Sequence, residues 1–372
     1  MDAAKTLDAT AKVAVRVVTG FLCSLMFTSI LWVSPQLIAQ PLVKEVPTPQ
    51  AQPIKGPGGQ EYLHDSLLMF DQAELPDGFW MYVPAQPIPQ EAPVVVFFHG
   101  YGGYNPMIYG AWIRHLVRKG NIVIFPRYQR NLISPKPDRF PENAAKGIRD
   151  AFELLTTQEG LPQPKLEHVS YFAHSYGGVI AAHLSVRAKA FDLPEPEAAL
   201  LCAPGSGPFN GAVLDDYSGF PAHTKLLIIT GERDRVVGEK FAWKLFREAA
   251  RTPWRNLLRQ YKDKYGKPEI EAGHNQSYAL DMSFDTGKRN PTARKALRIS
   301  RTDAVDFYGH WKLGDALLAC SRNGQWCDIA FGGTEAQRHL GVWSDGTPIR
   351  PLDVFLPSKQ DEATVDNRKV QR

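Results

Sequence analysis

The feature that most constrains this chain is Ser175, which stands between a strand-like run and a run that suits a helix. Residues 168–172 include Val, Tyr and Phe, and residues 179–184 are mostly Val, Ile, Ala and Leu. Small neighbours, Ala173 and Gly177 among them, are what a tight and strained turn requires. The pattern predicts a sharp strand-to-helix turn that presents a serine hydroxyl above a sheet, beside the amides of a helix N-terminus.

Apolar runs and helix-compatible runs alternate along the chain. Residues 94–98 are apolar throughout, as in a strand buried on both faces, and residues 122–126 form a second apolar run after Asn121. The alternation predicts an α/β fold with a mostly parallel, eight-stranded sheet and helices on both of its faces. The expected strands are 66–70, 79–83, 94–98, 121–126, 168–172, 198–203, 225–230 and 256–261. The expected helices are 107–119, 143–156, 179–184, 239–250 and 302–319.

A glycine-rich loop at residues 98–104 follows directly after a buried apolar run. Glycines allow backbone amides to turn inward, where they can stabilise the negative oxygen of a reacting carbonyl group. We expect the Tyr101 amide, rather than that of Gly102, to be one donor and the Tyr176 amide to be the other. His99, within the same loop, is expected to be structural.

An acidic residue follows the expected strand at residues 225–230. An acid just past the carboxyl end of a parallel strand can reach the edge of the sheet where ligands bind. Asp234 is the candidate that would orient a histidine and stabilise its imidazolium form. Glu232 is its competitor, and Asp215 and Asp216 are weaker candidates.

A histidine follows the acid in a loop that comes after the expected last strand. His274 lies beside Gly273, in a position from which its ring could reach both an acid and a serine. His174, next to the serine, is expected to point away from it and to serve packing. The order Ser175, Asp234, His274 therefore predicts a nucleophile, an acid and a base, in that sequence order.

On these motifs, residues 62–356 resemble the serine α/β-hydrolases, in particular secreted lipase-like, chlorophyllase-like and dienelactone-hydrolase-like esterases. The resemblance implies an α/β-hydrolase fold and the hydrolysis of esters through an acyl-enzyme. The expected reaction requires no cofactor and no metal. The chain departs from the family pattern in having alanine at position 173 and a long segment, residues 275–356, after His274. Thioester or amide cleavage on the same triad is a rival hypothesis, and a non-catalytic interaction protein on this fold is another.

Aromatic residues near the motifs indicate an apolar substrate, a small ester or a lipid-like one. Tyr101, Tyr104 and Tyr176 are expected to form a rim around the site. Residues 205–223 form a short flap rather than a long lid, and Phe209, Tyr217 and Phe220 within it are expected to line an aromatic wall. Trp311, Trp326 and Trp343 would cover the site or the edge of the sheet.

The N-terminus carries the pattern of an export signal. Lys and Arg precede an uncharged apolar run at residues 17–33, so residues 1–39 are a signal peptide or a retained membrane anchor. Residues 40–60 are expected to form a Pro/Gln-rich linker, residues 61–357 the hydrolase domain, and residues 358–372 a disordered tail. The folded part would lie in the periplasm or outside the cell.

Charge and cysteine content exclude further classes of protein. The net charge is +4 over 372 residues, and the basic residues are scattered, so nucleic acid is not an expected partner. Cys320 and Cys327 flank a turn-like loop and are expected to form a disulfide in an exported protein. Cys202 lies in an apolar run and is expected to be a buried, inert thiol.

Overall fold

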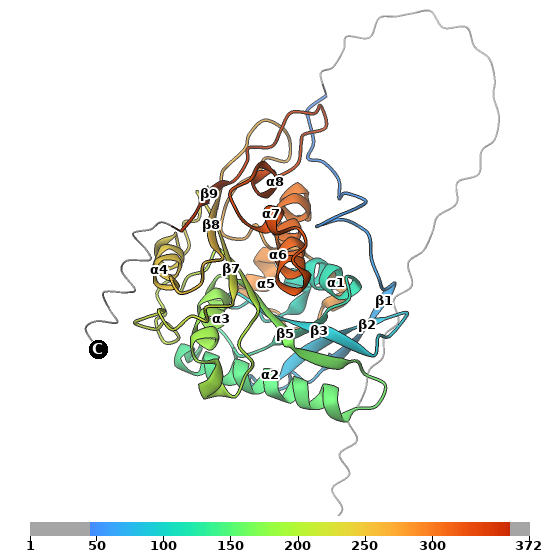
Figure 1. Ribbon diagram of the computed structural model, residues 1–372, viewed down its shortest axis with the longest axis vertical. Coiled ribbons are helices and arrows are strands. Elements are labelled where there is room, and N and C mark those ends of the chain that lie inside the picture. Colours follow the sequence, from blue (N-terminus) through green and yellow to red (C-terminus); the bar gives the residue numbers. More distant parts are fainter. Residues whose placement is uncertain (1–44, 358–372) are drawn as a thin grey trace, which may run out of the picture.

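The computed structural model describes residues 45–357 and contains one nine-stranded sheet (Figure 1). The strand order is β1-β2-β4-β3-β5-β6-β7-β8-β9. Six neighbouring strands, β4, β3, β5, β6, β7 and β8, run parallel to one another. Antiparallel strands flank them, β2 and β1 on one side and β9 on the other. The strands are β1 (Ser66–Asp71), β2 (Phe79–Ala85), β3 (Glu91–Phe98), β4 (Ile122–Pro126), β5 (Gln163–His174), β6 (Ala198–Cys202), β7 (Lys225–Gly231), β8 (Arg255–Gln260) and β9 (Asp353–Phe355).

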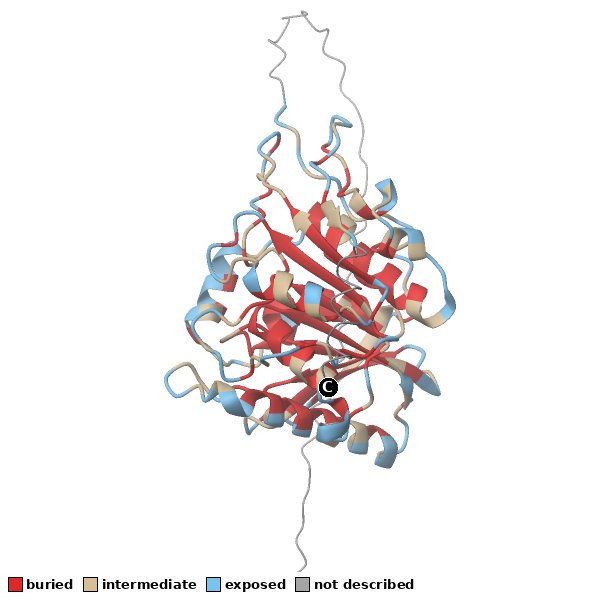
Figure 2. Cartoon of the chain, turned by 60° about the vertical axis from the view of Figure 1, so that its left-hand side comes forward, coloured by how far each residue is buried: buried red, intermediate tan, exposed pale blue. Residues whose placement is uncertain are grey.

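Helices cover both faces of this sheet, and the alternation of side chains along each strand explains why. Along β3, Val94 and Val96 belong to one apolar cluster, and Val95 and Phe97 belong to the other. One cluster is closed by α2 (Phe140–Thr157), α3 (Tyr176–Val186) and α4 (Lys240–Glu248), and the other by α1 (Gly110–Arg118), α5 (Pro291–Ile299) and α6 (Trp311–Asn323). Strands buried on both faces need such continuous apolar sequences. Figure 2 shows the buried strands between helices whose outer faces are exposed.

The α/β prediction is confirmed, and the differences lie at the C-terminal part of the chain. The sheet has nine strands rather than eight, because the short β9 pairs with β8 at the edge. The helix expected at residues 302–319 is present, but it contains a π-helical turn, Asp306–His310, and continues as α6 to Asn323. Helix α5 and the short helices α7 (Cys327–Ala330) and α8 (Glu335–Arg338) were not expected. Trp311 and Trp343 are buried in the cluster on the α1 face, near the sheet, whereas Trp326 is exposed.

The described part of the expected linker, residues 45–60, is tied to the rest of the molecule. The Gln50 amide donates to the carbonyl of Val342 at 3.0 Å, and the Gly58 amide donates to Asp315 Oδ2 at 2.8 Å. A Cβ added to Gly58 would lie 2.0 Å from the Phe307 carbonyl oxygen. The prediction of a flexible linker is therefore wrong for the segment around these contacts, because hydrogen bonds, of which that of Gly58 is buried, hold the backbone there.

The cysteine predictions can be compared with the structure directly. Cys320 and Cys327 form a disulfide that joins the end of α6 to α7, and Cys202 is free and buried on β6. The predicted signal or anchor at residues 1–39, its apolar run at 17–33 and the predicted tail at 358–372 lie outside the described residues. Within residues 45–357, no helix has the length and apolar character needed to cross a membrane.

Candidate active site

Ser175 occupies a strained backbone position between β5 and α3. Its φ of 55° and ψ of −124° are a combination that residues with a side chain rarely adopt. The Ser175 amide donates to the carbonyl of Cys202 at 2.9 Å, and its own carbonyl accepts from the amides of Gly178 at 2.9 Å and Gly205 at 3.2 Å. The structure therefore has the strand-to-helix turn that the sequence predicts, and its neighbours hold the serine in the strained conformation.

Close packing around the turn explains its small residues. A Cβ added to Gly177 would lie 2.3 Å from the carbonyl oxygen of Phe98 and 2.5 Å from that of His99. Ala173 is fully buried and pairs in register with Phe98 on the neighbouring strand β3. The first turn of α3 can approach the end of β3 only because position 177 has no side chain.

Three residues from distant parts of the sequence form one chain of hydrogen bonds. His274 Nε2 lies 2.8 Å from Ser175 Oγ, and His274 Nδ1 lies 2.7 Å from Asp234 Oδ2. An ionised carboxylate only accepts hydrogen bonds, so Nδ1 carries the proton and Nε2 can accept the proton of the serine hydroxyl. All three residues follow the carboxyl ends of parallel strands, β5 for Ser175, β7 for Asp234 and β8 for His274, at one edge of the sheet.

The loop after β7 directs Asp234, and not Glu232, toward the histidine. The second carboxylate oxygen of Asp234, Oδ1, accepts from the amides of Val236 at 2.8 Å and Val237 at 3.1 Å. Burial raises the pKa of the Asp234 carboxyl, but hydrogen bonds from His274 and these two amides outweigh it and hold the pKa below its ordinary value. The exposed Glu232 instead accepts from the amide of Lys262 at 2.6 Å, which leaves Asp234 as the acid that contacts His274.

The glycine-rich loop after β3 packs against the elbow. A Cβ added to Gly100 would lie 3.1 Å from Ser175 Cβ, so the backbone of this loop passes close to the serine. The Gly102 amide donates to Gln129 Oε1 at 2.7 Å and is therefore occupied. Among residues 45–357, the amides of Tyr101 and Tyr176 have no hydrogen-bond acceptor. Both amides are therefore free to bind an oxyanion.

His99 and His174 are buried and take structural positions rather than contacting the serine hydroxyl. The His99 ring stacks on Tyr128, with ring centroids 3.9 Å apart, and its two nitrogens face the carbonyls of Gly100 and Arg127. Burial lowers the pKa of His99 to about 4. A neutral imidazole has one N–H group, so only one of these two carbonyl contacts is a hydrogen bond.

The expected aromatic rim is wrong for two of its three residues. Tyr104 and Tyr176 are buried, and the Tyr176 hydroxyl accepts from the Ala212 amide at 3.2 Å instead of facing a ligand. Tyr101 remains half-buried and stacks on Phe209, with ring centroids 4.6 Å apart. The other two residues expected in the wall, Tyr217 and Phe220, are also fully buried. The aromatic surface near the site is therefore the stacked pair of Tyr101 and Phe209.

One supporting residue, Asn290, was missed in the sequence. Its side-chain Oδ1 accepts from the Ala293 amide at 2.8 Å and so caps α5, while Nδ2 donates to the Gly102 carbonyl at 2.8 Å. Asn290 thus links the start of α5 to the glycine-rich loop. The pair Asn290-Pro291 is a helix-start signal that could have located α5, although not its contact with the loop.

No model of a known protein family matches this chain, and a search of curated proteins found no match to its sequence. The chemical interpretation of the site therefore depends on its geometry. That geometry contains a strained serine, a histidine bonded to it, a buried carboxylate behind the histidine, and two free amides near the serine.

Proposed function

We propose that the protein is a serine hydrolase that cleaves carboxylic esters through an acyl-enzyme, on an α/β-hydrolase fold. One observation carries the proposal: the hydrogen-bonded chain from Asp234 through His274 to Ser175, which ends on a serine with a φ of 55°. A buried carboxylate behind an imidazole, with a hydroxyl in front of it, is an arrangement that activates a serine nucleophile. The order of the three residues along the chain and their positions after parallel strands support the same fold.

The first half of the reaction forms the acyl-enzyme. His274 Nε2 takes the proton from Ser175 Oγ while the oxygen attacks the ester carbonyl carbon. The carbonyl oxygen becomes negative and is stabilised by the amides of Tyr101 and Tyr176. The bond to the alcohol oxygen then breaks, and His274 returns its proton to the leaving alcohol. Asp234 stabilises the imidazolium that forms between these two proton transfers.

The second half releases the acid. A water molecule gives a proton to His274 Nε2 and attacks the acyl carbon, so that the same amides stabilise a second negative oxygen. The bond between the acyl carbon and Ser175 Oγ then breaks, and Oγ takes the proton back from His274 Nε2. The products are the alcohol and the carboxylic acid, and the mechanism uses neither a cofactor nor a metal.

The surroundings of the serine support an apolar ester as substrate. The half-buried rings of Tyr101 and Phe209 stack on each other. Tyr101 directly follows Gly100, whose backbone passes close to Ser175. Aromatic side chains of this kind bind an apolar acyl or alcohol group by packing. We therefore propose small-molecule or lipid-like esters with an apolar chain as the substrate class.

The disulfide supports a place outside the cytoplasm. Disulfides persist in oxidising compartments. The Cys320–Cys327 bridge links α6 to α7, and Cys320 is buried while Cys327 is half-buried. Together with the apolar run at residues 17–33, it supports export, with membrane association through that run if it is retained. Sequencing the N-terminus of the mature protein, in membrane and soluble fractions, tests both parts of this proposal.

A hydrolysis profile tests the proposed function. We expect p-nitrophenyl esters from acetate to decanoate to be cleaved, with kcat/KM rising along the series, and Ser175→Ala to lose this activity. Matched thioesters and anilides should be cleaved more slowly than the esters. Faster cleavage of either would favour the thioesterase or amidase alternative, and equal turnover by Ser175→Ala would favour the non-catalytic one.

A further inference from the structure

His174 connects the elbow to the backbone of the residue that we propose as the base. Its Nε2 lies 2.8 Å from the carbonyl oxygen of His274, and its Nδ1 lies 2.9 Å from the hydroxyl of Tyr109. The rings of His174 and His274 have centroids 4.9 Å apart. His174 is buried, as is Tyr109, so water does not compete for these two contacts.

Chemistry fixes the direction of each hydrogen bond in this group. The carbonyl of His274 can only accept, so Nε2 of His174 carries a proton and donates it. Burial lowers the pKa of His174 well below its ordinary value, so the ring is neutral and Nδ1 is an acceptor. The Tyr109 hydroxyl must then donate to Nδ1.

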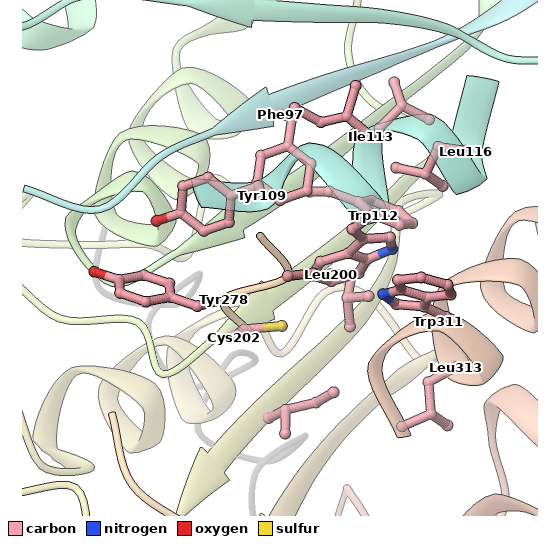
Figure 3. Close-up of a cluster of buried hydrophobic side chains, with 14 of the residues drawn as sticks. Phe97, Tyr109, Trp112, Ile113, Leu116, Leu200, Cys202, Tyr278, Trp311 and Leu313 are labelled. Atoms are coloured by element: carbon pink, nitrogen blue, oxygen red, sulfur yellow. The ribbon is translucent and has the colours of Figure 1, made fainter. Parts of the chain in front are cut away.

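The same hydroxyl reaches the glycine-rich loop. The Gly100 amide donates to the Tyr109 oxygen at 3.0 Å. Figure 3 shows the Tyr109 hydroxyl at the margin of an apolar cluster, pointing away from Trp112. The result is an unbroken series of hydrogen bonds that runs from Gly100 through Tyr109 and His174 to His274. Bonds connected in this way polarise and strengthen one another.

We propose that Tyr109 and His174 are positioning residues, which together hold the loop of the oxyanion donor and the backbone of the base in register with Ser175. The inference rests on the proposed function, because it assigns these residues to the geometry of that reaction. Each end of the series is fixed to a part that must not move: Gly100 precedes the Tyr101 amide, and the His274 carbonyl belongs to the residue that contacts Ser175 Oγ. Because His174 is neutral, the neighbouring His274 ring can become positively charged without repulsion from a second positive imidazole.

Removing the Tyr109 hydroxyl tests the proposal with little change in volume. Tyr109→Phe should lower kcat about tenfold or more and change KM less than about threefold, because misplaced reacting groups slow the chemical step. The rate of labelling by a fluorophosphonate should fall in parallel. Tyr82→Phe is the matched control: the Tyr82 hydroxyl is equally buried and, within residues 45–357, has no hydrogen-bond partner. Its kcat should stay within about twofold of wild type.

Variants of His174 add a rescue experiment. His174→Gln keeps an N–H donor that can reach the His274 carbonyl, and His174→Leu keeps none. We expect His174→Gln to retain more of kcat than His174→Leu, at similar KM. A kcat of Tyr109→Phe within about twofold of wild type, or an equal loss in Tyr82→Phe, would overturn the proposal.

A spectroscopic measurement separates this inference from the proposed function. Nitrogen-15 NMR of the histidine rings should show His174 neutral with its proton on Nε2, and Tyr109→Phe should shift the Nδ1 resonance. A proton on Nδ1 would overturn the inference, whatever the reaction. If Ser175→Ala instead hydrolyses esters as fast as wild type, the proposed function fails and the positioning role fails with it. If Ser175→Ala is inactive while Tyr109→Phe and His174→Leu are fully active, the positioning role alone fails.

Discussion

Ser175 Oγ lies 2.8 Å from Nε2 of His274, although the two residues are 99 positions apart in the sequence. The parallel sheet accounts for this approach. Ser175 follows β5, near the middle of the sheet, and His274 comes from the loop that follows β8. Carboxyl ends of parallel strands meet at one edge of the sheet, and an open α/β sheet binds its ligands at that edge.

Removing the charge of Asp234 tests the role of the acid. Asp234→Asn should lower kcat by about 10³- to 10⁴-fold, because an amide nitrogen can donate to His274 Nδ1 and so favours the wrong tautomer. Ester hydrolysis and fluorophosphonate labelling measure the effect. Glu232→Gln is the control, since Glu232 is exposed and contacts the Lys262 amide. Equal losses in the two variants would contradict the assignment of Asp234.

Acid should remove a part of the stability that Asp234 supplies. The pKa of this carboxyl is lower in the folded protein than its ordinary value of 3.8, so the folded state binds the proton less readily than the unfolded chain. The stabilisation is therefore present above the ordinary pKa and is lost as the pH falls through the folded pKa. We expect the difference in unfolding free energy between wild type and Asp234→Asn, measured with urea, to shrink from about pH 6 to about pH 2. A difference that is constant across this range would contradict the shift.

A side chain at position 100 should disturb the oxyanion loop. The Cβ of Gly100→Ala would lie 2.9 Å from His174 Nδ1 and 3.1 Å from Ser175 Cβ, so the loop must move away from the serine. We expect kcat for ester hydrolysis to fall about 10²-fold, in the range seen for the loss of one oxyanion donor. Gly273→Ala is the control, because no heavy atom lies within 4 Å of the added Cβ. A normal rate in Gly100→Ala would show that the loop is not part of the site.

The ring of Phe209 should matter for long substrates more than for short ones. Phe209→Ala removes the partner that stacks on Tyr101 at a centroid distance of 4.6 Å. We expect KM for an octanoate ester to rise about three- to tenfold, as for the loss of one aromatic contact, and KM for an acetate ester to change little. Phe191→Ala is a control, since Phe191 is also half-buried but lies beyond the far end of α3. Equal changes for both esters would argue against an apolar chain at this pair.

The layers of the fold could be predicted because the spacing and number of apolar residues along each segment reflect whether one or both of its faces are buried. β4 and β7 were located to within one residue at each end, and β3 was located except for its first three residues, Glu91 to Pro93, which are not part of the apolar run. Helix α5 and strand β9 were missed: the first is short and buries only Ala293 and Ala296, and the second has three residues in all. Their positions are decided by contacts with distant parts of the chain, which sequence periodicity does not contain.

The residues proposed for the chemistry were found from motifs, but the residues that hold them were not. Ser175, Asp234 and His274 stand in recognisable local patterns after strands. Tyr109 and Asn290 each make one hydrogen bond to the loop at residues 98–104, and no local sequence pattern indicates these contacts. The aromatic rim was overestimated for a related reason: exposure of a tyrosine depends on what packs over it, and Phe140 packs edge-on against Tyr176.

The most direct test of the proposed nucleophile is the site at which the folded protein reacts with a fluorophosphonate. After digestion, mass spectrometry should find the adduct on Ser175 and at no other serine, with ester hydrolysis lost in proportion to labelling. Ser175→Ala should show neither the adduct nor the activity, and Asp234→Asn should be labelled far more slowly. A folded protein that hydrolyses esters while Ser175 stays unmodified, or a Ser175→Ala variant with the wild-type rate, would contradict the account.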